Sequence, residues 1–252
     1  MSGHSKWATI KRAKGATDAK RGQLFTKLAK EIVVAVRQGG PDRNGNIRLR
    51  LAIQKARDNN MPADNVDRAI KKASGEGADG DQMAEVIYEG YAPGGAAILC
   101  EALTDNRNRT ASDVRATFAK AGGNLAEAGA VIWQFESRGV VVVEAPPEAA
   151  EELAMAAIDA GAEDFETFDS VLQVYSAPAG MGEVRRTLSE RDASITSSEV
   201  AMMPKNTIEL DESTALRTLR LLDQLEELDD VQRVFSNADF PDSALERYGA
   251  ES

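Results

Sequence analysis

The order of strand and helix patterns between residues 139 and 203 is the feature that most constrains the fold of this chain. A β-branched strand pattern at 139–144 opens the segment. It continues with an alanine-rich helix, two strands, a second helix and a last strand, at 147–160, 164–168, 171–175, 181–191 and 194–203. Strand, helix, strand, strand, helix, strand is the order of a ferredoxin-like α+β sandwich. We therefore expect an α+β domain over 139–203.

The segments on either side of this domain predict a second α+β domain that is split in the sequence. Before it, strand patterns at 84–91 and 96–103 form a hairpin, a helix covers 110–121 with Thr110 and Asp113 spaced as a capping box, and a strand covers 131–135. After it, a leucine-rich helix and a strand follow at 213–228 and 231–236. We expect a discontinuous domain over 82–136 and 206–240, into which 139–203 is inserted.

The first 75 residues have a different, helical pattern. An apolar stripe from Leu24 to Val36 ends at Gly39-Gly40-Pro41, and two shorter amphipathic helices follow, over 46–59 and from Pro62 to Gly75. Residues 1–22 have no such stripe and are expected to be a basic flexible arm, and 75–81 is an acidic linker. The predicted class is α+β with three domains: a three-helix domain over 23–75, then two ferredoxin-like α+β domains, one inserted in the other.

Charge is divided unevenly along the chain. Residues 1–75 hold 17 lysines and arginines against 6 acidic residues, whereas the remaining 177 residues hold 13 against 35. A net charge of +11 on one module of a protein whose net charge is −11 is typical of a module that binds a polyanion. The acidic remainder would be repelled by nucleic acid, so we expect it to orient the module or to bind partners.

The basic residues of this module, with one indole, are therefore the predicted nucleic-acid contacts. Lysine and arginine neutralise phosphates, and Trp7 would either stack on an unpaired base or brace the arm. Individual side chains on the helices could equally be solvated faces, including Arg68 within the same patch. The candidates are Lys6, Trp7, Lys11, Arg12, Lys14, Lys20, Arg21, Lys27, Lys30, Arg48, Arg50, Lys55, Arg57, Lys71 and Lys72.

A second candidate contact lies where the hairpin gives way to its helix. The loop from Thr104 to Thr110 carries Asn106, Arg107 and Arg109 in an acidic half of the chain. Its functional interpretation is a grip on a phosphate or a carbonyl. Its structural interpretation is a helix start capped by polar side chains.

Composition argues against most enzyme classes and against a membrane protein. The single histidine, His4, and the single cysteine, Cys100, leave no multi-histidine metal site, thiolate cluster or disulfide. No carboxylate pair has a context that marks an acid and a base, and the glycines at 90–95 match no nucleotide-binding loop. Apolar runs are too short to span a bilayer, and no secretory signal is apparent. We expect no catalytic residues, metal or cofactor, no membrane association, and a cytoplasmic location.

Short motifs along the whole chain resemble those of the YebC family. They are Gly3-His-Ser-Lys-Trp7, Asp18-Ala-Lys-Arg-Gly22, Phe25-Thr-Lys-Leu28, Asn60-Met-Pro62, Ala69-Ile-Lys-Lys72, Tyr88-Glu-Gly-Tyr91, Leu103-Thr-Asp-Asn-Arg-Asn-Arg-Thr110, Gly122-Gly-Asn-Leu125 and Val231-Gln-Arg-Val-Phe-Ser-Asn237. Each motif is weak alone, but their order and spacing are specific. The chain departs from the family pattern after Ile10, where Lys-Arg-Ala-Lys14 stands in place of a histidine and a further base, and at Ala63, where lysine is common.

The resemblance implies a three-domain fold, a bacterial cytoplasmic location and no catalytic activity. It also implies a regulator of gene expression, for which two descriptions compete. One is a probable transcriptional regulatory protein that binds DNA through its basic N-terminal region. The other is a ribosome-associated translation factor that relieves stalling by binding ribosomal RNA. The mitochondrial translational activator of cytochrome c oxidase subunit I is similar to this family. No base-reading helix stands out in the sequence, so both descriptions stay open.

Overall fold

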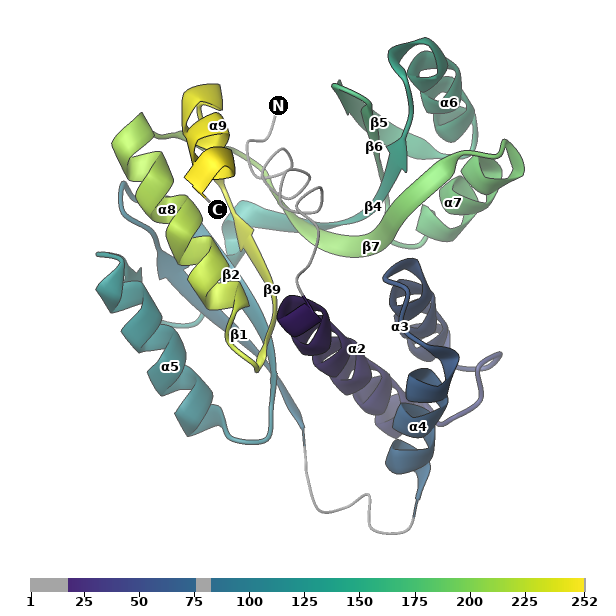
Figure 1. Cartoon of the computed structure of the whole chain (residues 1–252), viewed down its shortest axis with the longest axis horizontal. Coiled ribbons are helices and arrows are strands. Elements are labelled where there is room, and N and C mark those ends of the chain that lie inside the picture. The colour runs from purple at the N-terminus through teal and green to yellow at the C-terminus, as the bar shows by residue number, and fades with distance from the viewer. Residues whose placement is uncertain (1–17, 76–82, 252) are drawn as a thin grey trace.

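The computed structural model describes residues 18–75 and 83–251 and shows a helical domain beside two sheet domains (Figure 1). The helices and antiparallel sheets confirm the predicted α+β class with a helical N-terminal part. The arm residues 1–17 and the linker residues 76–82 lie outside the described residues. Within the described ranges, no helix is both long enough and apolar enough to cross a membrane.

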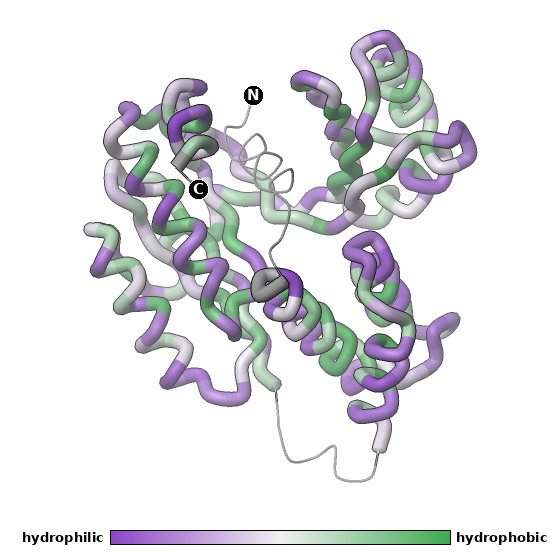
Figure 2. Tube along the Cα trace, viewed as in Figure 1, coloured by the Kyte–Doolittle hydropathy of each residue, from purple (hydrophilic) through white to green (hydrophobic). Residues whose placement is uncertain are grey.

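The helical domain consists of three helices around a core of its own. They are α2 (Asp18–Gly39), α3 (Ile47–Asp58) and α4 (Ala63–Ser74). Helix α2 begins at Asp18, within the segment that the sequence assigned to the arm. Along α2, hydrophobic stretches alternate with hydrophilic ones (Figure 2). The apolar cluster of this domain draws all its members from residues 24–73.

Asn46 joins the first two helices of this domain. Its side-chain oxygen accepts a hydrogen bond from Leu49 N at 2.9 Å and so caps α3. Its amide nitrogen donates to the carbonyl oxygens of Ala35 and Gly40, at 2.7 and 2.8 Å, at the end of α2. A Cβ on Gly39 would lie 2.6 Å from that nitrogen, so the chain needs glycine there.

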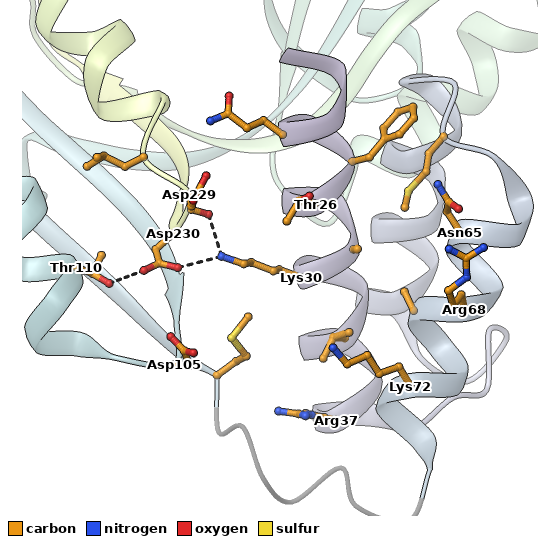
Figure 3. A pocket seen from close by; sticks show the side chains of 18 of the residues that line it. Thr26, Lys30, Arg37, Asn65, Arg68, Lys72, Asp105, Thr110, Asp229 and Asp230 are labelled. Carbon is orange, nitrogen blue, oxygen red and sulfur yellow. Dashed lines mark hydrogen bonds and ion pairs between the residues drawn. The ribbon is translucent and has the colours of Figure 1, made fainter. Parts of the chain in front are cut away.

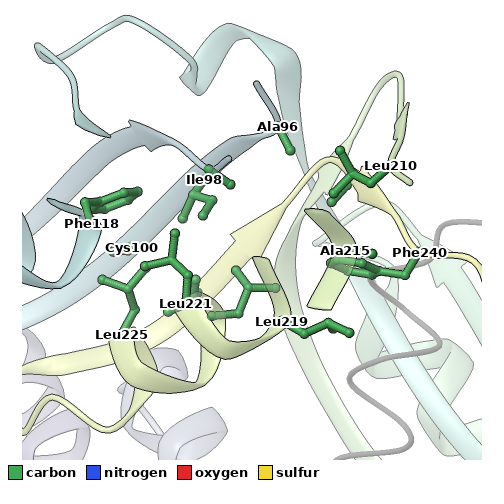
Figure 4. Close-up of a cluster of buried hydrophobic side chains, with 14 of the residues drawn as sticks. Ala96, Ile98, Cys100, Phe118, Leu210, Ala215, Leu219, Leu221, Leu225 and Phe240 are labelled. Carbon is green, nitrogen blue, oxygen red and sulfur yellow. The ribbon is translucent and has the colours of Figure 1, made fainter. Parts of the chain in front are cut away.

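The discontinuous domain is a four-stranded antiparallel sheet covered on one face by two helices. Its strands lie in the order β3-β1-β2-β9. Its elements are β1 (Ala84–Tyr91), β2 (Ala97–Thr104), α5 (Arg107–Lys120), β3 (Asn124–Leu125), α8 (Glu212–Glu226) and β9 (Val231–Ser236). Figure 4 shows Phe118 of α5 and Leu225 of α8 packed against Ile98 and Cys100 of β2, all of them buried. The layers resemble a ferredoxin-like sandwich, with a strand connectivity different from that of the inserted domain.

The inserted domain has the strand order expected for a ferredoxin-like sandwich, β5-β6-β4-β7, with every pair antiparallel. Its elements are β4 (Phe135–Glu144), α6 (Pro147–Asp159), β5 (Ala162–Phe168), β6 (Val171–Ser176), α7 (Met181–Glu190) and β7 (Ser194–Pro204). The long strands β4 and β7 extend toward the discontinuous domain (Figure 1). There, Phe135 packs with Leu99 and Phe235 on the sheet face opposite the helices.

The predicted strand at 131–135 is wrong. This segment contains a 3₁₀ helix, η1 (Ile132–Gln134), and strand β4 starts only at Phe135. The buried carboxylate of Glu89 accepts hydrogen bonds from the backbone nitrogens of Val131 and Ile132, at 2.7 and 2.8 Å. Those two nitrogens are therefore not available to a strand ladder.

The helix predicted from Thr110 starts at Arg107 instead, and Thr110 does not open a capping box. Asn106 is the N-cap, because its side chain accepts a hydrogen bond from Arg109 N at 3.1 Å. Two further features were not predicted at all. They are a parallel pair formed by β8 (Ile208–Glu209) and β10 (Ala238–Asp239), and the last helix, α9 (Asp242–Glu251).

Candidate nucleic-acid interface

Five of the basic side chains on α3 and α4 are exposed and make no ion pair within the described parts of the chain. Arg50 and Arg57 lie two turns apart on α3, while Arg68, Lys71 and Lys72 share one side of α4. Four of these are predicted contacts, and Arg68 extends the same patch. We call these five residues the free basic patch. It is the part of the described helical domain whose cations remain available to an external anion.

Other predicted contacts pair with the acidic domains instead. Arg48 forms an ion pair with Glu85 of β1 at 2.7 Å, and this hydrogen bond lowers the pKa of the Glu85 carboxyl. Lys55 lies 2.8 Å from Glu31 and 3.8 Å from Glu199 of β7. These contacts hold α3 against both sheet domains.

The lysines of α2 also contact the discontinuous domain. Lys30 Nζ donates to the Asp230 carboxylate and to the Asp229 carbonyl oxygen, at 2.9 Å each, and Lys27 Nζ donates to the Glu226 carbonyl oxygen. Arg21 is exposed at the start of the same helix and has contacts of its own.

The remaining candidates cannot be placed as side chains. Lys20 belongs to helix α2, but its side chain lies outside what the structure describes. Lys6, Trp7, Lys11, Arg12 and Lys14 lie outside the described residues, so their predicted role stays a prediction.

A cleft of about 1090 Å³ separates the helical domain from the discontinuous domain. One wall carries Arg68 and Lys72 of α4, and the other carries Asp105, Asp229 and Asp230. Figure 3 shows Lys30 of α2 extending across the space between these walls to Asp229 and Asp230. The cleft therefore has a basic side and an acidic side.

Asp230 is the most connected carboxylate of the acidic wall. In addition to Lys30, its carboxylate accepts from Arg109 at 2.7 Å, from Thr110 Oγ1 at 2.8 Å and from Thr104 Oγ1 at 3.3 Å. Burial raises the pKa of the Asp230 carboxyl, but the hydrogen bonds from Arg109, Lys30 and Thr110 outweigh it and lower this pKa to about 2. Asp230 is thus ionised throughout the physiological range.

The 104–110 loop forms the capped start of α5, which is the structural interpretation of its sequence. Asn106 caps α5, and Arg109 pairs with Asp105 and Asp230, which raises the pKa of the Arg109 guanidinium. Arg107 is exposed, and its carbonyl oxygen accepts a hydrogen bond from the Tyr88 hydroxyl at 3.2 Å. A role of Asn106, Arg107 and Arg109 in nucleic-acid binding stays a prediction, and among the described residues the Arg107 side chain, unlike the other two, makes no hydrogen bond or ion pair.

A smaller cleft, of about 380 Å³, lies where the three domains meet. Lys55 and Glu199 line it together with Arg233 and Glu101, which pair at 2.7 Å. Sequence reasoning missed this cluster, Asp230 and Glu89. In the sequence, each of these carboxylates is a single acidic residue within a strand or after a helix. The neighbouring residues do not indicate which distant side chain or backbone group it contacts.

The described residues offer no sign of metal or thiol chemistry. Among them no group of three or more histidine, cysteine, aspartate or glutamate side chains could hold a metal ion. Cys100 is buried in the discontinuous domain, and burial raises the pKa of its thiol, which disfavours the nucleophilic thiolate.

The fold and the charge distribution define a class of protein: a three-domain α+β protein whose basic helical module is held against two acidic sheet domains. Two family models match this chain, the TACO1/YebC protein N-terminal domain over residues 5–76 and the TACO1/YebC second and third domain over residues 83–238. The chain therefore belongs to the TACO1/YebC family, as its motifs predicted.

Similar proteins span nearly the full length of the chain. A protein of Dehalococcoides mccartyi named as a probable transcriptional regulatory protein is 57% identical over 252 residues, covering 100% of both chains. Another, from Rubrobacter xylanophilus, is 51% identical over 245 residues, covering 97% of this chain and 98% of the relative. The crystal structure of a conserved hypothetical protein from Aquifex aeolicus has a TM-score of 0.82 and 47% identity, covering 89% of this chain and 93% of that one.

Proposed function

We propose that this protein is a nucleic-acid-binding regulator of gene expression that contacts phosphates through its basic N-terminal module. The observation that carries the proposal is the free basic patch. Arg50, Arg57, Arg68, Lys71 and Lys72 stay exposed and without an ion pair among the described residues, although the adjoining domains are rich in carboxylates. The names of the relatives support a regulatory role.

The geometry favours contact with the phosphate backbone over base reading. A recognition helix contacts base edges with the side chains of its first turns. In α4 these positions carry Asp64, which phosphates repel, and Asp67, which pairs with Arg43, and the basic side chains follow at Arg68, Lys71 and Lys72. Affinity should therefore depend strongly on salt and weakly on sequence.

Transcriptional regulation through DNA is the first form of this proposal. Its alternative is a ribosome-associated translation factor that binds ribosomal RNA, and the acidic start of α4 favours that alternative. A protein that grips phosphates without reading bases can still select a structured RNA by its shape. Crosslinking in cells followed by sequencing of the bound nucleic acid separates the two forms, because promoter DNA and ribosomal RNA are distinct products.

Two charge-reversal variants test the free basic patch. Lys71→Glu/Lys72→Glu should weaken the binding of random-sequence RNA and DNA by about tenfold or more and reduce the salt slope by about two contacts. Arg115→Glu/Lys120→Glu is the matched control, since it changes the net charge equally on exposed positions of α5. Equal losses in both variants would contradict the assignment to the free basic patch. A gel-shift titration at two salt concentrations provides both affinity and slope.

A further inference from the structure

One face of α2 is bound to the end of α8 by three side chains. Gln23, Lys27 and Lys30 are spaced by four and then three residues, so they share one side of the helix. Gln23 Nε2 donates to the Glu227 carbonyl oxygen at 3.2 Å, and Lys27 Nζ donates to the Glu226 carbonyl oxygen. Lys30 Nζ donates to the Asp229 carbonyl oxygen and the Asp230 carboxylate, at 2.9 Å each. All the acceptors lie within residues 226–230, which we call the acidic turn.

The acidic turn resembles a phosphate backbone in the groups that it presents to these lysines. Four of its five residues are acidic, and its first carbonyls are at the C-terminal end of α8, where the helix dipole is negative. The lysine ammonium groups thus contact closely spaced oxygens that carry negative charge. Lys27 and Lys30 lie on the basic module, where a polyanion would otherwise attract them.

For α2 to leave the acidic turn, the helical domain must also release the ion pairs that α3 makes with the sheet domains, and these lie at the surface or are only partly buried. Without Lys30, the Asp230 carboxylate keeps Arg109 at 2.7 Å and Thr110 at 2.8 Å, both from its own domain. The freed carbonyls would face the 1090 Å³ cleft, where water can hydrogen-bond to them. The apolar cluster of the helical domain is complete within residues 24–73, so the domain can move without opening its core.

We propose that the acidic turn is an autoinhibitory contact: it occupies the Lys27 and Lys30 face of α2, and nucleic acid binds that face only when the helical domain separates from α8. The separation itself is a property of the protein alone, whereas the competition with nucleic acid rests on the proposed function. In the closed state the free basic patch makes the first contact, and release of α2 then adds two lysines.

Domain separation can be measured by energy transfer between two dyes. Ser74→Cys at the end of α4 and Ser112→Cys on α5 are exposed and lie on opposite sides of the cleft. Cys100 is buried, so it does not compete for the dyes. We expect efficient energy transfer in the doubly labelled protein that carries no other substitution, and a decrease in transfer when a short random-sequence RNA is added.

Asp230→Asn removes the charge of the contact and keeps an acceptor for Arg109 and Thr110. It should reduce energy transfer without RNA and increase RNA affinity by about twofold to fivefold, the upper part of the range that surface ion pairs give. Asp113→Asn is the matched control, because Asp113 is an exposed carboxylate that lines the same cleft. It removes the same charge and should leave energy transfer unchanged, with only a small gain in affinity.

Lys30→Gln breaks the contact from the other side. It should also reduce energy transfer, but RNA affinity should not rise, because the variant loses a phosphate contact. Unchanged transfer in both Asp230→Asn and Lys30→Gln, or equal affinity gains in Asp230→Asn and Asp113→Asn, would overturn the autoinhibitory contact. Absence of RNA binding in every variant would overturn the proposed function and the competition with it. Energy transfer measured without RNA would still show whether the acidic turn holds the helical domain against the discontinuous domain.

Discussion

At the scale of single residues, Glu89 shows how one buried charge fixes a loop. Its side chain accepts hydrogen bonds from the backbone nitrogens of Gly129, Val131 and Ile132, at 2.6, 2.7 and 2.8 Å. Burial raises the pKa of the Glu89 carboxyl, but the three backbone donors outweigh burial, and this pKa lies below its usual value. The carboxylate therefore replaces the strand pairing that the sequence suggested for this segment.

Glu89→Gln should destabilise the protein by about 2–3 kcal/mol, because an amide presents one oxygen and one donor where three backbone donors need acceptors. The measurement is urea-induced unfolding at neutral pH. Glu127→Gln is the matched control in the same loop, where the side chain is exposed, and should change stability by about 0.5 kcal/mol or less. A loss in Glu89→Gln no larger than that of the control would contradict the role given to this carboxylate.

Asp230 predicts a pH dependence at the same scale. Its folded pKa of about 2 is depressed, whereas its unfolded pKa is about 3.9. Its stabilising contribution is thus complete above pH 4 and lost as pH falls through about 2. The difference in unfolding free energy between wild type and Asp230→Asn should be constant from about pH 5 to 8 and shrink in the acidic window. Urea unfolding over a pH series measures it, and a difference that grows toward low pH would contradict the assignment.

At the scale of secondary-structure elements, Asn46 decides how α2 and α3 meet. Asn46→Ala removes the N-cap of α3 and the donor to two carbonyl oxygens of α2, so it should cost about 2 kcal/mol. Because the helical domain has its own apolar core, amide exchange should accelerate in α2, α3 and α4 more than in the sheets.

Asn108→Ala is the control for this prediction. Asn108 is exposed in the first turn of α5 and does not cap it, so stability should change by about 0.5 kcal/mol or less. Uniform acceleration across all three domains in Asn46→Ala would show that the helical domain is not an independent unit.

At the scale of the whole molecule, the helical domain has an apolar cluster of its own and meets the sheet domains mainly through polar contacts, whereas the two sheet domains share a cluster that includes Phe135 and Leu99. The helical cluster is complete within residues 24–73, and the inserted domain has a cluster of its own. Ion pairs join the helical domain to each sheet domain: Arg48 pairs with Glu85 of the discontinuous domain at 2.7 Å, and Asp58 pairs with Arg185 of the inserted domain at 3.2 Å. This arrangement allows the basic module to be removed without opening the sheet domains.

A chain that lacks residues 1–75 should keep a cooperative thermal transition and lose nucleic-acid affinity, since the removed segment carries the net charge of +11. In the full chain, the logarithm of affinity should fall by about 0.7 to 0.9 per phosphate contact with the logarithm of salt. Calorimetry and gel shifts at two salt concentrations measure both effects. Retained affinity in the shortened chain would assign binding to the acidic domains.

Much of the fold could be predicted because its signals are local. The stripe from Leu24 to Val36 and the order of elements over 139–203 each lie within one continuous segment, and both correspond to observed elements. The failures occurred where a distant side chain intervened, as with Glu89 and the nitrogens of Val131 and Ile132. The same holds for the candidate contacts. Lys71 and Lys72 could be selected from the local charge pattern alone, because that selection did not depend on any distant residue.

The sequence by itself determined most of the helical and sheet segments and the separation of charge, because periodicity and charge are properties of neighbouring residues. Only the tertiary structure decided which cations are free. Lys30 and Lys72 are alike as lysines on basic helices, yet Lys30 pairs with Asp230, 200 positions away, while Lys72 stays exposed at the cleft. An ion pair depends on the distance between two groups in space, and no pattern within either segment encodes that distance.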